Sequence, residues 1–492
     1  MRKLRDHRLL LGSLLFLGAV VRVVFFLQLK DTDLATVPLL DSQTYHEWAA
    51  RLVAGDWGWN ETYWMGPLYP HLLAVIYKLF GVGSQMALVF QLGLSLLNVW
   101  LVYLLGKKVS GSPGTALLAA TLFSLYGAPV FYAGMLLMAT VVTTLYLLVA
   151  LQTFRATEHP TLGNWIGLGL LVGLAGLARG NLLLLMVTLP VLLWKASDIA
   201  SDQRWHRTTA LVAACLLMLL PVTVRNLVVA HDFVLLTSNG GVNLLIGQQA
   251  DYKGIFAPVM EEPQAEFDPS METTLERELG RDLKGSEVSR ILTRRAIQEF
   301  TSNLPAMPMH YLRKIYRFWN GYELPQIVSY DYWHGQFGAL RPLILPFVFL
   351  SAVGLLGIRF LPVRQRWIMI MLVGSYFLSL LPFFPTSRYR QPVVPLLAIT
   401  AAAFILTMVR TSNQERRLWL PAALLLMVLL LPRWASLDPA EVTWQVHLHE
   451  ASRASKVGNL KTTLAKGRQA EEARPGLADT PFHLSLYLED LD

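Results

Sequence analysis

The chain has 492 residues, of which 54% are hydrophobic and 15% are charged, and its mean hydropathy is +0.42. This composition excludes an ordinary soluble domain and indicates a protein that is solvated by lipid. The formal net charge of +8 does not indicate nucleic-acid binding, because the basic residues form small clusters at the ends of apolar runs. Such clusters are typical of membrane helices with a fixed orientation.

The first apolar run extends from Leu9 to Leu27 and follows several basic residues. It is too long for the apolar part of a cleavable signal and has no small-residue cleavage pattern, so we predict an uncleaved membrane span. Arg22 lies inside this run. Because an arginine is costly in lipid, we expect its side chain to face other helices.

Ten further runs approach the length of about twenty apolar residues that a membrane span needs. The expected spans are 85–105, 113–131, 134–153, 163–178, 180–194, 208–229, 341–359, 366–384, 391–409 and 417–432. The shortest, 180–194, could instead form a tight hairpin with the run before it. With a cytoplasmic N-terminus, every short inner loop carries Lys or Arg, as the positive-inside rule requires, and the C-terminal tail lies outside.

We therefore predict an all-α polytopic membrane protein with about eleven transmembrane helices. A transmembrane domain at 1–434 would carry two outer loops, 30–84 and 230–340, and a short helical tail at 435–492 would follow it outside. In the large loop, Phe233–Thr237 indicates a short strand before a glycine turn, and helices are expected near 286–302 and 308–320. The large outer loop is thus expected to mix α and β structure.

The glycines of the run 163–178 and the single cysteine are interpreted as packing residues. Gly169 and Gly173 have the spacing that lets two membrane helices approach closely, and no strand precedes them as a nucleotide-binding loop would require. Cys215 is the only cysteine, so no intramolecular disulfide can form, and we expect it to be a small buried residue.

The first outer loop begins with Asp41, followed by a predicted amphipathic helix at the membrane surface. The apolar face of this helix consists of Tyr45, Trp48, Ala49, Leu52 and Val53. Asp41 has two possible roles: an N-cap of this helix, or a general base that takes a proton from an acceptor hydroxyl or amine. The aromatic run around Trp64 either belongs to an interfacial belt or stacks on sugar rings.

Three stretches of this loop resemble the first extracytoplasmic loop of the GT-C membrane glycosyltransferases. They are Asp41-Ser42-x-x-Tyr45, Gly55-Asp56-Trp57 and Gly66-Pro67-Leu68-Tyr69-Pro70. They are most similar to the branch with protein O-mannosyltransferases and aminoarabinose transferases, glycosyltransferase family 39. In that superfamily the aspartate at the position of Asp41 is the catalytic base.

Later stretches extend the resemblance. Gly176–Asn181 is similar to a turn of the family that contains an arginine, here Arg179, although Gly180 replaces the usual proline. Pro221–Asn226, with Arg225, looks like the end of the span before the large outer loop. The outer turn at 126–138 departs from the family, because it has no carboxylate where many relatives carry one and Ala133 stands at a plausible position.

The segment Pro385–Pro392 places Arg388 and Arg390 directly before an apolar run on the outer side. These arginines could snorkel to the interface, or they could bind a phosphate, to which a guanidinium donates two hydrogen bonds. The segment resembles the family's site for the lipid phosphate of the donor. We therefore predict that Arg388, Arg390 and Arg179 bind the donor, with Tyr45, Tyr389 and Arg225 as weaker candidates for substrate contacts.

The resemblance implies an enzyme that moves a sugar from a polyprenyl-phosphate-linked donor to a protein, lipid or glycan acceptor outside a bacterial inner membrane. Asp41 would deprotonate the acceptor, and displacement would invert the anomeric carbon. No cofactor is predicted, although Glu47 or Asp56 could contribute to a divalent-cation site. A transporter or flippase of lipid-linked sugars is the alternative, but the sequence shows no internal repeat. A non-catalytic scaffold is a third reading.

Overall fold

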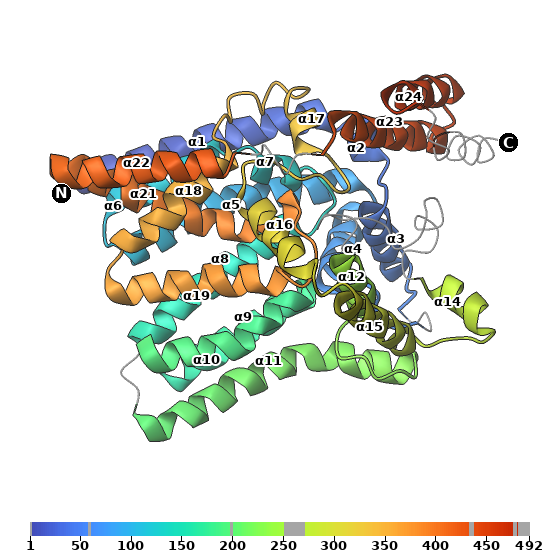
Figure 1. Ribbon diagram of the computed structural model, residues 1–492, viewed down its shortest axis with the longest axis horizontal. Helices are drawn as coiled ribbons and strands as arrows, with labels where there is room; N and C mark the ends of the chain where they lie inside the picture. Colours follow the sequence, from blue (N-terminus) through green and yellow to red (C-terminus); the bar gives the residue numbers. More distant parts are fainter. Residues whose placement is uncertain are drawn as a thin grey trace.

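The computed structural model describes residues 2–57, 61–196, 200–249, 271–431, 437–475 and 480. Throughout these residues the regular structure is helical, and the only β-pairing is one isolated bridge between Tyr126 and Ile344. The long helices lie side by side in one bundle, and most of the short helices gather at one end of it (Figure 1). We call that end the outer end.

The bundle helices are α1 (Arg2–Leu29), α5 (Ser84–Ser110), α6 (Pro113–Leu125), α8 (Ala139–Glu158), α9 (Leu162–Ala178), α10 (Leu185–Ala196), α11 (Ser201–Val229), α18 (Phe347–Gly357), α19 (Val363–Leu380), α21 (Val394–Arg410) and α22 (Asn413–Leu429). Each predicted span falls on one of them. Among the described residues, five stretches are long and apolar enough to cross a membrane. These are Asp6–Leu29, Gln85–Ser110, Ala139–Glu158, Ser201–Val229 and Ser387–Arg410. The chain is thus an all-α integral membrane protein.

The weakest predicted span, 180–194, has an irregular start. After α9, Arg179 adopts an extended backbone, and a 3-10 turn from Gly180 to Leu184 precedes α10. The helix that follows runs beside α19 in the bundle and has Pro190 in its interior. The stretch therefore does not continue α9, and its first turn lies where the bundle meets the outer end.

Polar groups inside the bundle find partners on neighbouring helices. Arg22, in α1, donates from Nη2 to Ser95 Oγ at 2.9 Å and to Ser95 O at 3.2 Å, and from Nη1 to Gly18 O at 2.9 Å. The expectation that Arg22 faces other helices is confirmed. Cys215 is buried in α11, also as expected.

The outer end is built from short helices of the two loops and the tail (Figure 1). They are α2 (Asp33–Thr36), α3 (Asp41–Val53), α4 (Leu68–Phe80), α12 (Gly240–Gln248), α14 (Glu272–Leu279), α15 (Gly285–Ser302), α16 (Met307–Trp319), α17 (Tyr330–His334), α23 (Pro439–Lys456) and α24 (Leu460–Ala473). The two helices expected in the large loop are confirmed as α15 and α16. The helix pair of the tail is tied to the first loop, because Lys456 Nζ donates to Gln43 Oε1 at 2.6 Å.

The predicted strand at Phe233–Thr237 is wrong, because this segment has no strand partner among the described residues. Its carbonyl groups are satisfied by side chains of α11 instead. Asn226 Nδ2 donates to Val234 O at 3.0 Å and to Leu236 O at 3.2 Å, and Thr223 Oγ1 donates to Leu235 O at 2.8 Å. The described part of the large loop is therefore helical and irregular, without the β structure we expected.

The glycines of α9 let this helix approach α11 closely, as their spacing predicts. A Cβ atom added at Gly169 would lie 2.2 Å from Leu211 O, and one at Gly173 would lie 2.7 Å from Cys215 O. Both obstacles are backbone atoms, so they cannot rotate away. The contact between α9 and α11 matters for the site because each helix ends beside a candidate site residue.

We predict that Gly169→Ala destabilises the protein by about 1–3 kcal/mol, because the added methyl group forces the two helices apart. The matched control is Gly93→Ala in α5, where an added Cβ meets nothing within 4 Å. Its stability should be unchanged or slightly raised, since alanine favours helix over glycine. Thermal unfolding in detergent measures both variants. Equal melting temperatures for the two would contradict the packing argument.

Candidate functional site

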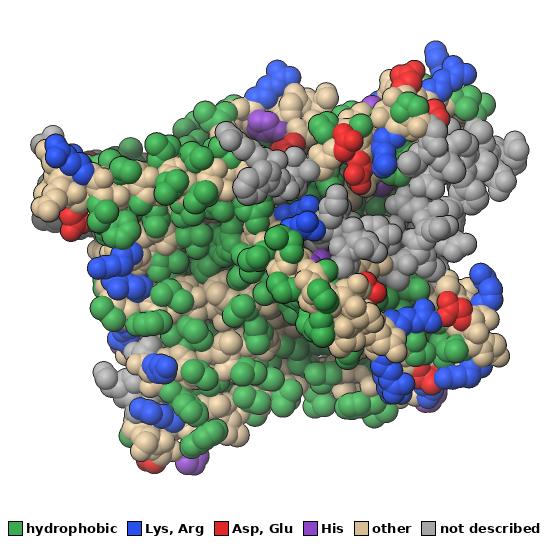
Figure 2. Space-filling view, viewed as in Figure 1, with side chains coloured by type: hydrophobic (Ala, Val, Ile, Leu, Met, Phe, Trp, Pro, Cys, Tyr) green, Lys and Arg blue, Asp and Glu red, His purple; other side chains and the backbone are tan. Residues whose placement is uncertain are grey.

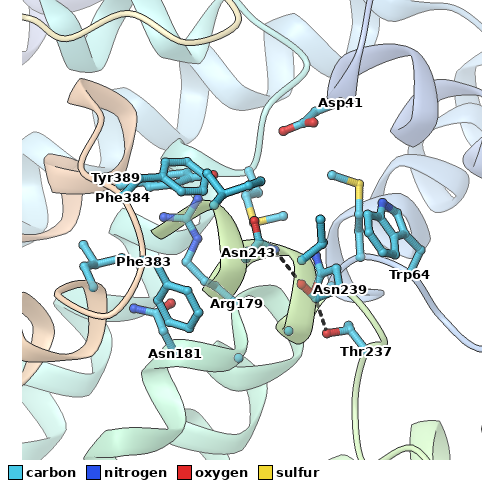
Figure 3. Close-up of a pocket in the computed structure, with 18 of the residues that line it drawn as sticks. Asp41, Trp64, Arg179, Asn181, Thr237, Asn239, Asn243, Phe383, Phe384 and Tyr389 are labelled. Atoms are coloured by element: carbon cyan, nitrogen blue, oxygen red, sulfur yellow. Dashed lines mark hydrogen bonds between the residues drawn. The ribbon is translucent and has the colours of Figure 1, made fainter. Parts of the chain in front are cut away.

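A cavity of about 360 Å³ lies where the bundle meets the outer end. Its walls come from α3, the segment before α4, the turn between α9 and α10, and α12 (Figure 3). The residues Gln326 and Arg388 also line it. The lining includes Asp41, Tyr45, Trp64, Arg179, Asn181, Thr237, Asn239, Asn243, Gln326, Phe383, Phe384, Arg388 and Tyr389. Five of the seven predicted site residues line this cavity, namely Asp41, Arg179, Arg388, Tyr45 and Tyr389.

Asp41 is the first residue of α3, and its carboxylate faces the cavity (Figure 3). The N-cap position belongs to Leu40, and no side-chain capping bond is present at this helix start among the described residues. Instead, Asp41 Oδ2 accepts a hydrogen bond from Arg388 Nη1 at 2.8 Å. The N-cap interpretation of Asp41 is therefore not supported. Its side chain is 26% exposed, so it remains open to a bound molecule.

The backbone that delivers Asp41 is strained. Leu40 has a φ of 51° and a ψ of −129°, a conformation that a residue with a Cβ rarely adopts. Such outliers cost about 1–3 kcal/mol and persist only where the surroundings enforce them. Here the strain turns the chain into α3 so that Asp41 points at Arg388.

Arg388, in the short helix α20 (Ser387–Arg390), is held on several sides. Its Nε and Nη2 atoms donate to Gln326 Oε1 at 3.1 and 2.8 Å, and Nη2 also donates to the Tyr389 hydroxyl at 3.1 Å. Only 6% of the residue is exposed. The guanidinium is thus pre-positioned between the first outer loop and the end of the large loop.

Arg179 lies against the ring of Tyr389, as Arg388 does. Its guanidinium carbon is 4.0 Å from the ring centroid, and that of Arg388 is 4.8 Å from it. Arg179 also hydrogen-bonds with Tyr376, but no carboxylate of the described residues forms an ion pair with it. Two guanidinium groups therefore lie against one aromatic ring, and only one of them forms an ion pair with a carboxylate of the described residues. This arrangement favours the binding of an anion.

Tyr45 is buried, with 1% exposure, and packs edge-on against Tyr69 at a ring distance of 4.9 Å. Burial, assisted by the nearby charge of Asp41, raises the pKa of Tyr45 well above its usual range. The hydroxyl therefore stays protonated and can only act as a neutral hydrogen-bonding group at the cavity wall.

Arg390 is not among the described residues that line the cavity, although it stands two residues after Arg388. It is 1% exposed and forms an ion pair with Glu323 Oε2 at 2.8 Å. It also donates to Asn320 O at 2.9 Å and to Tyr322 O at 2.8 Å. These contacts anchor the segment that carries Gln326. Because Gln326 orients Arg388, Arg390 acts indirectly on the position of Arg388.

Arg225 is likewise not among the described residues that line the cavity. Its Nη1 atom donates to Glu61 O, and its guanidinium carbon lies 4.4 Å from the centroid of the Tyr63 ring. The segment it holds leads directly into Trp64, which does line the cavity. Its role in the structure is therefore to fix the backbone on which Trp64 stands.

The carboxylates considered for a divalent cation have other partners. Asp56 Oδ2 accepts from Arg51 Nε at 2.8 Å, and Glu47 Oε1 accepts from Gln43 Nε2 at 2.7 Å. Within the part of the chain that the structure describes, no group of three or more His, Cys, Asp or Glu side chains could hold a metal ion.

Sequence reasoning did not identify Gln326, Asn239 or Asn243 as site residues. Gln326 orients Arg388, and the two asparagines are linked, because Asn243 Nδ2 donates to Asn239 O at 2.9 Å. Each is a single polar residue in a loop or at a helix start, without a periodic pattern around it. Trp64 belongs to the aromatic run for which sugar stacking was one of two interpretations.

The helix α12, which forms part of the cavity wall, is held in place by hydrogen bonds from side chains of α16. Gly247 O accepts hydrogen bonds from His310 Nε2 at 2.9 Å and from Lys314 Nζ, and Gln248 Nε2 donates to Pro382 O at 2.7 Å. Lys314 is buried, and burial lowers its pKa to about 7. The position of α12 thus depends on hydrogen bonds from a buried lysine side chain.

Comparisons with known proteins concern the family and the fold of this chain. The family model described as dolichyl-phosphate-mannose-protein mannosyltransferase matches residues 65–235, which include Arg179 but not Asp41 or Arg388. The solved apo structure of the oligosaccharyltransferase of Archaeoglobus fulgidus aligns with a TM-score of 0.51 at 13% identity, over 98% of this chain and 59% of that one. The chain therefore shares its fold with that oligosaccharyltransferase structure.

Two further structures are similar to this chain at lower scores. AglB from the same archaeon, in complex with an inhibitory peptide and a dolichol-phosphate, gives 0.49 at 15% identity, over 99% of this chain and 60% of that one. ArnT from Cupriavidus metallidurans, bound to undecaprenyl phosphate, gives 0.37 at 14% identity, over 98% and 76%. The chain spans about 60% of the length of the oligosaccharyltransferase structures. No curated protein matches its sequence.

We predict that Glu323→Ala lowers the free energy of unfolding by about 3–5 kcal/mol, because it leaves the buried charge of Arg390 uncompensated. The control is Glu278→Ala, which removes an exposed partner of Arg295 at 2.6 Å and should change stability little. Thermal unfolding in detergent measures the difference. A Glu323→Ala protein as stable as the control would show that the pair does not hold the segment.

The buried lysine predicts a pH dependence of stability. An unfolded chain keeps the lysine proton up to about pH 10, whereas the folded protein releases it near pH 7. Because the unfolded state binds more protons over that window, the free energy of unfolding contributed by Lys314 rises as the pH increases from 7 toward 10.

The measurement is the melting temperature of wild type and of Lys314→Met between pH 6 and 9. We expect the wild-type value to rise more steeply than that of the variant above pH 7. Parallel curves would contradict the assignment to Lys314.

Proposed function

We propose that this protein is a glycosyltransferase that moves a sugar from a polyprenyl-phosphate-linked donor to an acceptor on the extracytoplasmic face of the membrane. The observation that carries the proposal is the ion pair between Asp41 and Arg388 in a cavity where the bundle meets the outer end. A base and a phosphate-binding cation are thus held together at the level where a lipid-linked donor and a water-soluble acceptor can meet.

The donor phosphate would bind between Arg388 and Arg179, beside Tyr389. Arg179 offers a positive charge without a carboxylate partner among the described residues, and guanidinium groups suit the oxygens of phosphate. Apolar lining residues on the bundle side of the same cavity, such as Leu380 and Phe383, would contact the first part of the lipid chain.

Asp41 would act as the general base. Its Oδ2 atom is used by Arg388, and its Oδ1 atom makes no hydrogen bond with any described residue, so one oxygen is available for an acceptor. As this oxygen takes the acceptor proton, the acceptor lone pair attacks the anomeric carbon and the bond to phosphate oxygen breaks. The electron pair leaves with the phosphate, whose charge the arginines stabilise, and the anomeric configuration inverts.

The ion pair would also be affected by the donor. A donor phosphate would compete with Asp41 for the hydrogen bond from Arg388 Nη1. Donor binding would thus release the second carboxylate oxygen of Asp41, so that both oxygens could face the acceptor.

The proposed topology has eleven spans, a cytoplasmic N-terminus, a transmembrane domain at 1–434 and an extracytoplasmic tail at 435–492, in a bacterial inner membrane. Hydrophobic side chains cover the bundle surface between Lys and Arg clusters at one end and mixed charges at the outer end (Figure 2). This distribution supports the proposal, since basic residues favour the cytoplasmic side.

The first test is Asp41→Asn in proteoliposomes supplied with a labelled polyprenyl-phosphate sugar. We expect transfer to fall by about 10²–10⁴-fold, the usual contribution of a general base, while donor binding persists. Asp56→Asn, which changes an exposed carboxylate of the same loop, is the matched control and should transfer normally. Wild-type turnover by a folded Asp41→Asn protein would exclude the base assignment.

A second measurement separates transfer from transport. A transferase releases one free polyprenyl phosphate for each sugar transferred, whereas a flippase leaves its lipid chemically intact. Movement of intact donor across the membrane without phosphate release would favour the flippase alternative.

Arg179→Ala should weaken donor binding at least tenfold, because it removes a charged hydrogen-bonding partner of the phosphate.

A further inference from the structure

The cavity has a polar wall that the reaction described above does not use. In Figure 3, Thr237, Asn239 and Asn243 lie across the cavity from Asp41, between Arg179 on one side and Trp64 on the other. All four of Thr237, Asn239, Asn243 and Trp64 line the cavity. We call these four residues the amide wall.

Hydrogen-bonding groups of the amide wall are left available. Asn243 Nδ2 donates to Asn239 O at 2.9 Å, and Asn239 Oδ1 accepts from Thr237 Oγ1 at 3.0 Å. Asn243 Oδ1 and Asn239 Nδ2 make no hydrogen bond with any described residue. One acceptor and one donor group therefore face a cavity, and a hydroxyl group can satisfy both kinds.

The wall is rigid because α12 is closely packed at both ends. A Cβ atom at Gly241 would lie 2.2 Å from Ser289 O, and one at Gly247 would lie 2.3 Å from Pro382 O. Gly241 N also donates to Ser289 Oγ at 3.1 Å. Groups that are held in place before a ligand arrives lose little entropy on binding, so such a wall favours specific recognition.

The charges around the cavity limit what this wall can bind. Among the described lining residues, the only carboxylate is Asp41, and it is paired with Arg388; the only other cation is Arg179. In the proposed complex Arg179 and Arg388 hold the phosphate and Asp41 faces the acceptor, so an ammonium or carboxylate group of the sugar at the amide wall would lose its water without gaining a counter-ion. Hydroxyl groups have no such penalty, because the amides satisfy them.

From this arrangement, and resting on the proposed transferase function, we propose that the amide wall recognises the sugar of the donor and selects an uncharged sugar over an amino or acidic one. The ring hydroxyls would bind Asn239 and Asn243, and the apolar face of the ring would stack on Trp64. The phosphate would remain between the arginines, so the anomeric carbon lies between the phosphate site and the amide wall, facing Asp41.

The test uses the full chain in nanodiscs and three probes: polyprenyl phosphate, a polyprenyl-phosphate hexose, and the same lipid carrying an amino sugar. We expect wild type to bind the hexose donor at least tenfold more tightly than the amino-sugar donor, since the latter buries an unpaired charge. Asn243→Ala should lose roughly tenfold in affinity for the hexose donor and keep its affinity for polyprenyl phosphate.

Asn243→Asp adds a carboxylate to the wall and should shift the preference toward the amino-sugar donor. Asn303→Ala, at the end of α15 and not among the described lining residues, is the matched control and should bind all three probes like wild type. Equal or tighter binding of the amino-sugar donor by wild type would overturn the proposal. So would an equal loss for all probes in Asn243→Ala.

A failure of this inference can be distinguished from a failure of the proposed function, because this inference is tested by donor affinity and the function by sugar transfer. If sugar selection follows the amide wall but no variant or wild type transfers sugar, the recognition site stands and the transferase function fails. If Asp41→Asn abolishes transfer but Asn243→Ala binds the hexose donor normally, the function stands and this inference fails.

Discussion

The structure depends most on the ion pair between Asp41 and Arg388, at 2.8 Å. It joins the first outer loop to a helix 347 residues later in the chain, and the cavity forms around it. Gln326 and Tyr389 orient the arginine, and the strained backbone of Leu40 orients the aspartate. Because Arg388 is almost fully buried, loss of Asp41 would leave a charge without a partner, so this pair supports the architecture as well as the proposed chemistry.

The sequence predicted the helices well because membrane spans depend on a simple property, an apolar run of sufficient length. It also placed Asp41, Arg179 and Arg388 on one side, and the structure brings all three to one cavity. The sequence could not show that Arg388 lines the cavity whereas Arg390 is not among the described lining residues. Residues two apart on a helical turn face different directions, and only the position of Glu323, from a distant loop, shows which arginine turns inward.

The remaining errors have a common physical origin. The run Phe233–Thr237 has the composition of a strand, but a strand needs a partner for its carbonyl groups, and here Asn226 and Thr223 of α11 supply it. Gln326 and Asn243 were not predicted as site residues, because nothing in the sequence around them marks them. An isolated amide in a loop gives no periodic signal, and its importance arises only from what the fold places beside it.

The contact between the tail and the first loop has a consequence for biogenesis. Gln43, two residues after Asp41, contacts Lys456 of α23, so the outer flank of α3 is completed by a residue that lies 413 positions later in the chain. Chains emerge from the ribosome N-terminus first. A nascent chain would therefore expose this flank of α3 until α23 has been made, so the candidate site could be completed only after the bundle helices from α1 to α22 have been synthesised.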